Sequence, residues 1–210
     1  MRSNILLVLA AALCPLLSWA QDGLLATSYE RADGSKGPGQ LVYQPGFRSQ
    51  LLLQESASEP GSKSAQKGKP LAPGDVRSFE VGADHYVLLR SIKLDNGIPM
   101  TLTMMKEDDF AKVLETGKIQ LLEYRVFYTT SSSSASTASG RDFQANSTPV
   151  YLLRRPDENN AVMIPVTAKK YRQVLASYLV GRPDLIEKLD KKAKSEAELR
   201  ALIQDYNAAP

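Results

Sequence analysis

A single histidine limits the nucleophilic chemistry open to this chain. His85 is the only histidine in 210 residues, so a Ser-His-Asp triad would have to use it. It lies in the segment GADHYVLLRSI, where an apolar run after a Gly-Ala-Asp turn predicts a strand. Neither a nucleophile elbow nor an oxyanion loop accompanies it. We therefore interpret His85 as an ordinary strand residue and predict no catalytic residue.

Acidic side chains are the other source of catalytic chemistry. A glycoside hydrolase needs two carboxyl groups about 5–10 Å apart across a cleft. The candidate acids are Glu107, Asp108, Asp109 and Glu123. The sequence does not determine their separation, so a carboxylate-based hydrolase acting on an extracellular substrate such as a glycan stays as the alternative function.

The first three of these acids also have a structural interpretation. In KEDDFAKVLETG they precede Phe110, Val113 and Leu114, which are spaced as on one face of a helix, and Gly117 follows. Acidic residues at the start and glycine just past the end are typical helix boundaries. The pattern predicts a short helix over residues 106–117.

Metal and cofactor chemistry has little support in the sequence. With one histidine and one cysteine, Cys14, no multi-histidine or cysteine-rich metal site can form within the chain. The acidic turn PDENN lacks the alternating spacing of a calcium loop, and GSKGPGQ lacks the ending of a phosphate loop. We predict neither a metal site nor a cofactor.

The first twenty residues predict export. Arg2 precedes an apolar run over residues 5–17, and Ser18 and Ala20 are small residues at the −3 and −1 positions of a cleavage site. A cleaved signal peptide over residues 1–20 follows, with the protein periplasmic or secreted. A membrane anchor is the alternative, but the run is shorter than the about 20 residues that spanning needs. Lipidation at Cys14 is a further alternative, although Leu13 stands where a small residue belongs.

The mature chain divides into four segments by composition. Residues 21–54 contain short apolar runs typical of a β-hairpin and a further strand. Residues 55–74 are rich in Ser, Gly, Pro and Lys and predict a flexible loop or linker. Residues 75–166 predict a β-rich body with one short helix, and the stretch SSSSASTASGRDFQANS, residues 131–147, predicts the flexible tip of a hairpin. The strands of this body are expected within residues 75–81, 85–92, 99–105, 118–130, 148–155 and 160–166.

Residues 167–207 carry three short amphipathic helices. The first has an apolar stripe from Tyr171 to Leu179, with Gly181 beyond its end, and Pro183 fits the first position of the second. The third begins at Ser195 in a capping box. Because isolated helices this short are marginal in water, we expect them to cover the β-rich body. A surface that recruits another protein is the alternative. The expected packing residues are Tyr171, Leu175, Tyr178, Leu185, Leu189, Leu202 and Tyr206.

These patterns predict an α+β fold, in which an antiparallel β-rich body, either a sandwich or an open barrel, is followed by three helices. Charge argues against nucleic acid as a partner. Without Arg2, the 26 basic residues become 25 against 23 acidic ones, a net charge of +2, and the two signs are mixed along the helices. None of the three helices is long or apolar enough to enter a membrane, so no transmembrane segment is expected in the mature chain.

Four motifs together resemble a broad group of uncharacterised exported bacterial proteins with a β-rich body and a short helical tail. The motifs are PGDVRSF, FAKVLETGKIQLLEY, RPDLIEKL and LIQDYNAA, and the resemblance covers residues 73–207. The Ser-rich stretch 130–140 and the region before Pro73 depart from the pattern. The resemblance implies no functional residues. The sequence thus predicts a non-enzymatic binding or structural protein of the bacterial envelope or exterior, with a protein partner in the envelope as one possibility.

Overall fold

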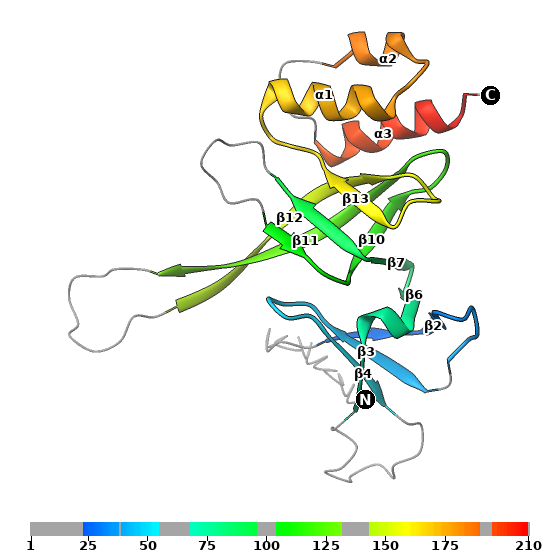
Figure 1. Ribbon diagram of the computed structural model, residues 1–210, viewed down its shortest axis with the longest axis vertical. Coiled ribbons are helices and arrows are strands. Elements are labelled where there is room, and N and C mark those ends of the chain that lie inside the picture. Colours follow the sequence, from blue (N-terminus) through cyan, green and yellow to red (C-terminus); the bar gives the residue numbers. More distant parts are fainter. Residues whose placement is uncertain are drawn as a thin grey trace, which may run out of the picture.

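In the computed structural model of this protein, residues 23–37, 39–54, 68–95, 104–131, 143–189 and 195–209 are described. They form three tiers along the long axis of the molecule: a four-stranded sheet, a nine-stranded sheet and three helices (Figure 1). This arrangement confirms the predicted α+β fold with a β-rich body and a helical C-terminus.

The four-stranded sheet has the order β1-β3-β4-β5 and is antiparallel throughout. Its strands are β1 (Leu24–Ala26), β3 (Gln40–Gln44), β4 (Gln50–Gln54) and β5 (Lys69–Leu71). The pairing of β1 with β3 confirms that the two apolar runs are antiparallel partners, but the polar turn predicted between them is wrong, because Ser28–Arg31 is a strand of the other sheet. The predicted loop over residues 55–74 is wrong at its end, because Lys69–Leu71 pairs with β4; residues 55–67 lie outside the described residues.

The nine-stranded sheet has the order β2-β6-β7-β10-β11-β12-β13-β8-β9. Its strands are β2 (Ser28–Arg31), β6 (Val76–Val81), β7 (Asp84–Leu89), β8 (Ser91–Leu94), β9 (Met104–Lys106), β10 (Asp109–Glu115), β11 (Gln120–Ser131), β12 (Phe143–Arg154) and β13 (Asn160–Met163). A single 3₁₀ turn, Pro73–Asp75, precedes β6.

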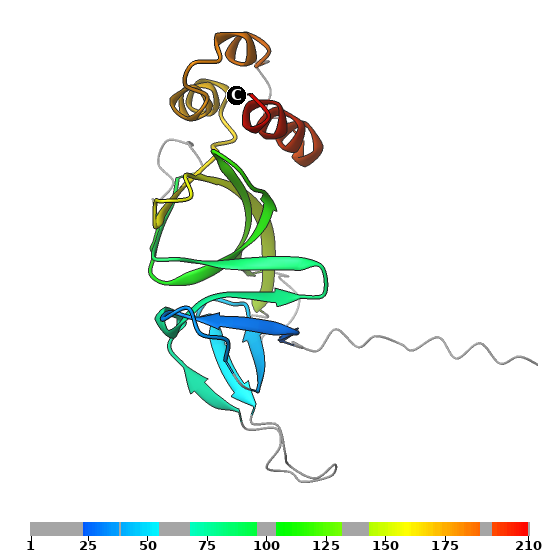
Figure 2. The same cartoon turned by 90° about the vertical axis from the view of Figure 1, so that its right-hand side faces the viewer.

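This sheet curls into a barrel (Figure 2). The chain continues from β7 through Arg90 into β8, while β10, β11, β12 and β13 follow as neighbours between these two strands. Because successive neighbours run in opposite directions from β7 to β13, β13 has the direction of β7 and pairs in parallel with its continuation, β8. The barrel is therefore closed because β7 and β8 are two parts of one bent segment, of which β7 pairs with β10 and β8 pairs with β13. The single strand predicted over residues 85–92 is thus divided at Arg90 between β7 and β8.

The barrel interior contains apolar side chains from all six of these strands. They are Leu89, Ile92, Leu94, Ala111, Leu122, Tyr124, Leu152, Ala161 and Met163. A second apolar cluster joins the four-stranded sheet to the β2, β6, β7 and β10 side of the barrel, and it includes Tyr43, Phe79 and Phe110.

Residues 109–115 form strand β10, so the helix predicted over residues 106–117 is wrong. This strand is buried on both faces: Ala111 lies in the barrel interior, Phe110 in the cluster with the N-terminal sheet, and Leu114 under the helices. A strand covered on both sides lacks regular alternation of apolar and polar residues. The spacing of Phe110, Val113 and Leu114 therefore resembled that of a helix.

The helices are α1 (Ala168–Tyr178), α2 (Pro183–Glu187) and α3 (Glu196–Asn207). The structure confirms Pro183 in the first turn of α2 and the Ser195–Glu198 capping box of α3. The helices cover one end of the barrel (Figure 1). Their side chains pack in one cluster with Leu114, Ile119, Leu121, Leu153 and Ile164 of the body, which confirms the expected helical cap.

Asn207 at the end of α3 is hydrogen-bonded to the turn between β10 and β11. Its amide nitrogen donates to the carbonyls of Thr116 (3.2 Å) and Ile119 (2.9 Å), and its oxygen accepts from the Ile119 amide (3.0 Å). A side chain at Gly117 would meet Asn207 at 2.4 Å, and the φ of Gly117 is +151°. Glycine is therefore needed here for close approach and not, as predicted, to end a helix.

Candidate functional site

Asp109 is the centre of the most densely bonded polar cluster in the described residues. Its side chain is 1% exposed. The Tyr43 hydroxyl donates to Oδ1 (2.9 Å), and the hydroxyls of Tyr124 (2.7 Å) and Ser49 (3.0 Å) donate to Oδ2. These donors come from the four-stranded sheet and from β11, so one carboxylate joins the two sheets.

Lys106 supplies the positive charge of this cluster. Its ammonium group forms an ion pair with Asp109 Oδ2 and donates to the Gly46 carbonyl (3.2 Å) and to the Ser49 hydroxyl (3.3 Å). It also lies 5.4 Å from the centre of the Tyr124 ring. The buried carboxylate is thus neutralised and hydrogen-bonded, as a buried charge requires.

The two tyrosines of the cluster are held as neutral hydrogen-bond donors. Burial, followed by the charge of Asp109, raises the pKa of both Tyr43 and Tyr124 well above the ordinary value. A catalytic base or nucleophile needs access to a reacting atom, whereas every oxygen of Asp109 is already engaged by a side chain of the protein. The arrangement supports a structural role for Asp109.

The other candidate acids are not gathered around Asp109. Glu123 and Tyr124 are consecutive residues of β11 and point to opposite faces of the strand; because Tyr124 bonds Asp109, Glu123 faces away from it. Glu107 is exposed and Asp108 half-buried in the link before β10. Asp109 and Glu123 therefore do not share a face, and the geometry gives the hydrolase alternative no support.

His85 lies on β7 opposite Glu80 of β6, where it is exposed. In the described ranges no three His, Cys, Asp and Glu side chains are arranged to hold a metal ion. No described helix combines the length and the apolar character needed to cross a membrane.

A second buried charge has neutral partners. Arg154 of β12 is 9% exposed, and its guanidinium donates to Gln120 Oε1 (2.8 and 2.6 Å) and to the Leu88 carbonyl (3.3 Å). Burial lowers its pKa. Among the described residues no carboxylate forms an ion pair with Arg154. Its hydrogen bonds connect β12 with β11 and β7.

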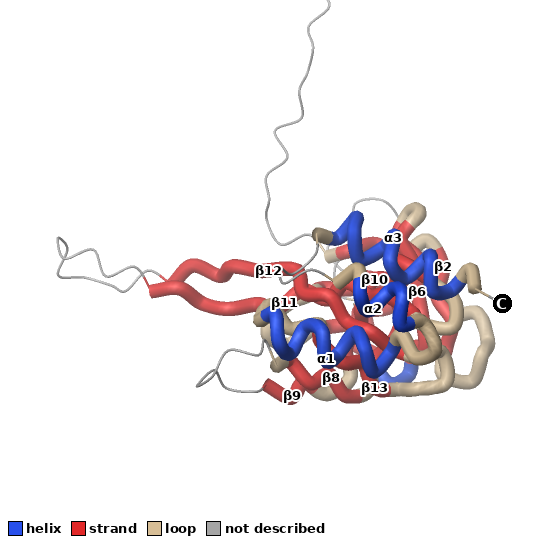
Figure 3. Tube along the Cα trace, turned by 90° about the horizontal axis from the view of Figure 1, so that it is seen from above, coloured by secondary structure: helices blue, strands red, loops and turns tan. Residues whose placement is uncertain are grey.

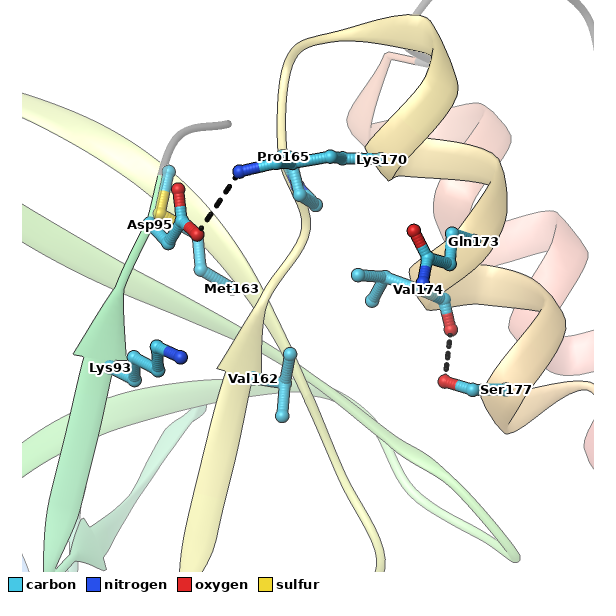
Figure 4. A pocket seen from close by; sticks show the side chains of 9 residues that line it. All are labelled: Lys93, Asp95, Val162, Met163, Pro165, Lys170, Gln173, Val174 and Ser177. Carbon is cyan, nitrogen blue, oxygen red and sulfur yellow. Dashed lines mark hydrogen bonds and ion pairs between the residues drawn. The ribbon is translucent and has the colours of Figure 1, made fainter. Parts of the chain in front are cut away.

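A shallow hollow of about 300 Å³ lies between the barrel and the first helix (Figure 4). Val162 of β13 and Val174 of α1 stand on its two walls, and the Lys170–Asp95 ion pair (3.4 Å) crosses one end. The hollow offers a small apolar surface with the charges of Lys93, Asp95 and Lys170 beside it. It provides no buried polar group directed at a ligand.

The long hairpin of β11 and β12 extends away from the rest of the molecule (Figure 3). Residues 126–131 pair with residues 143–148, from Val126↔Thr148 to Ser131↔Phe143, and we call this part the ribbon. β10 pairs with β11 only over residues 121–123, and β13 pairs with β12 only at residues 152 and 153. Both edges of the ribbon are therefore open with respect to the described strands. The hairpin tip predicted over residues 131–147 is wrong at its two ends, because Ser131 belongs to β11 and residues 143–147 belong to β12; residues 132–142 lie outside the described residues.

Aromatic side chains lie on both faces of the ribbon base. Phe47, from the turn between β3 and β4, is 55% exposed, and its ring centre lies 6.4 Å from that of Phe127. Tyr128 is 43% exposed and accepts a hydrogen bond from Thr148 (3.4 Å). Because Phe127 and Tyr128 are consecutive residues of β11, Tyr128 lies on the face opposite the contact between Phe47 and Phe127.

Sequence reasoning missed both the Asp109 cluster and the open ribbon. One signal for the cluster was present, because an acid adjoining Phe110 and Ala111 in an apolar segment must be paired if the segment is buried. Its partners Tyr43 and Ser49 come from about sixty residues away, which no local pattern indicates. Comparisons with protein-family models, with curated proteins and with solved structures found no match to this chain.

Proposed function

We propose that the protein is an exported, non-enzymatic binding protein of the bacterial envelope or exterior, and that it presents the ribbon to another protein. The predicted signal peptide and the resemblance to exported bacterial proteins support the location. The open ribbon supports the mode of action.

The observation that carries the proposal is the chemistry of the ribbon edges. Open strands expose main-chain donors and acceptors that pair readily with another strand, and proteins usually block them with charged residues. The described ribbon, residues 126–131 and 143–148, contains no Asp, Glu, Lys or Arg, although 23% of the whole chain is charged. An uncharged open edge is suited to binding by strand addition, in which a partner extends the sheet.

The cluster around Asp109 supports the non-enzymatic part of the proposal. Its carboxylate is fully engaged by Tyr43, Ser49, Tyr124 and Lys106, which suits the joining of two sheets better than proton transfer.

Site-specific crosslinking in the producing organism tests the proposal. A photo-crosslinking residue at Ser147, on the ribbon, should give a protein adduct that the same residue at exposed Lys188, far from the ribbon, does not give. Equal adducts at both positions, or none at Ser147, would contradict binding through the ribbon.

The intact mass of the exported form should correspond to a chain that starts at Gln21, and a mass retaining residues 1–20 would refute cleavage.

A further inference from the structure

Two observations establish which main-chain groups of β12 face away from β11. In an antiparallel pair of strands, opposite residues alternate between pairs that exchange two hydrogen bonds and pairs that exchange none. Pro149 lies opposite Arg125 and has no amide hydrogen, so this is a pair without hydrogen bonds, and its main-chain groups point away from the partner strand. The Tyr151 carbonyl accepts from the Ile164 amide (2.8 Å), on the side opposite β11. Both observations assign the odd-numbered residues of β12 to the outer edge.

Within the ribbon, the outward residues are therefore Phe143, Ala145 and Ser147, because the direction of main-chain groups alternates along a strand. Their amides and carbonyls have no neighbouring described strand, since β13 pairs with β12 only at residues 152 and 153. Pro149, which offers no donor, separates this open edge from the part of β12 that β13 covers.

We propose that this edge binds the same edge of a second copy of the chain, so that two ribbons form one four-stranded antiparallel sheet. The inference rests on the proposed function and names the partner. An antiparallel pair of identical strands, related by a two-fold axis, brings outward residues of one copy opposite outward residues of the other. The outer edge of β12 in one copy can thus form hydrogen bonds with the same edge in a second copy.

Charge and geometry both favour a second copy. The ribbon has no charged side chain among its described residues, so two copies meet without repulsion. Because the ribbon extends clear of the body (Figures 1 and 3), antiparallel pairing places the two bodies at opposite ends of the joint sheet, where they do not collide. A two-stranded ribbon is marginal in water by itself, and independent stability needs three or more strands with an apolar face.

Sedimentation equilibrium of the purified protein tests the pairing with two variants at one position. Ser147→Pro removes an outward amide but no hydrogen bond to β11, because Ser147 faces outward. Ser147→Ala keeps the amide and is the matched control. We expect a dimer for the wild type and for Ser147→Ala, and a dimer weakened at least about tenfold for Ser147→Pro, since two-fold symmetry removes two hydrogen bonds.

Thermal unfolding and hydrogen exchange make the result decisive. At a concentration where the wild type is monomeric, Ser147→Pro should unfold at the wild-type midpoint, and the wild-type amides of Ala145 and Ser147 should gain protection as the concentration rises. A monomer at every concentration with these amides unprotected would overturn the second copy as partner. A dimer that Ser147→Pro leaves intact would do the same, because its interface lies elsewhere. If the crosslink at Ser147 then captures a different protein, the proposed function stands without this inference.

Discussion

The two junctions of the β-rich body are built from different chemistry. The four-stranded sheet meets the body through aromatic rings, with Tyr43 and Phe79 5.3 Å apart, and through the buried charge of Asp109. The helical cap meets it mainly through aliphatic side chains, and most of its polar bonds lie at the rim, such as Arg200–Glu115 (2.7 Å). A buried ion pair demands defined partners, whereas aliphatic packing depends mainly on shape and volume. We therefore expect the first junction to be sensitive to the loss of single polar atoms and the second to the loss of volume.

The largest effect should come from Asp109→Ala. It leaves Lys106 without its ion pair and deprives three buried or half-buried hydroxyls of their acceptor, so the free energy of unfolding should fall by about 3–5 kcal/mol. Chemical denaturation measures this loss. Lys106→Met should also be destabilising, because it leaves the buried Asp109 carboxylate with its three hydroxyl donors but without a neutralising charge. A silent Asp109→Ala would show that aromatic packing alone holds this junction.

At the cap, Leu185→Ala should reduce the free energy of unfolding by about 2–5 kcal/mol through the cavity it creates. Leu185 is 1% exposed and lies in the cluster that the helices share with the body. Val180→Ala is the control, since Val180 is 65% exposed and should change stability by less than about 0.5 kcal/mol. Unchanged melting for Leu185→Ala, with Leu175→Ala and Leu202→Ala equally silent, would refute the cap and favour a recruitment surface.

The third prediction removes a single oxygen atom from the first junction. Tyr43→Phe keeps the ring against Phe79 and Phe110 but removes the donor to Asp109, so it should cost about 1–2 kcal/mol. Tyr128→Phe removes a hydroxyl on the exposed ribbon and should leave the denaturation midpoint unchanged. Equal effects of the two substitutions would mean that the hydrogen bond of Tyr43 contributes nothing specific.

The smallest effect concerns the rim of the cap, where Arg182 donates twice to Asp184 (2.9 and 2.8 Å). These hydrogen bonds lower the pKa of the Asp184 carboxyl from its ordinary value of 3.8 to about 2. Because the folded pKa is depressed, the pair stabilises the fold above pH 3.8, and its contribution is lost as the pH falls through about 2. An NMR titration of the Asp184 carboxyl should give this midpoint, and Arg182→Gln should return it toward 3.8. A midpoint that Arg182→Gln does not move would exclude the pair as its cause.

The sequence predicted the elements of the cap more completely than those of the other junction. The helices follow local rules, namely the stripe from Tyr171 to Leu179, Pro183 in a first turn and the box at Ser195, and the structure confirms each. Strand β10 was mistaken for a helix because burial on both faces removes the alternation that identifies strands. The partners of Asp109 depend on pairing between distant segments, which propensity and spacing do not encode.

The hydrogen bonds of Asn207 set an order of events during synthesis. The turn between β10 and β11 can form as soon as its own residues exist, but its bonds from Asn207 to Ile119 must wait until 88 further residues have been made. Closing so long a segment is slow compared with forming a local hairpin. Until the end of the third helix reaches the turn, this corner of the barrel therefore exposes amide and carbonyl groups that the finished molecule covers.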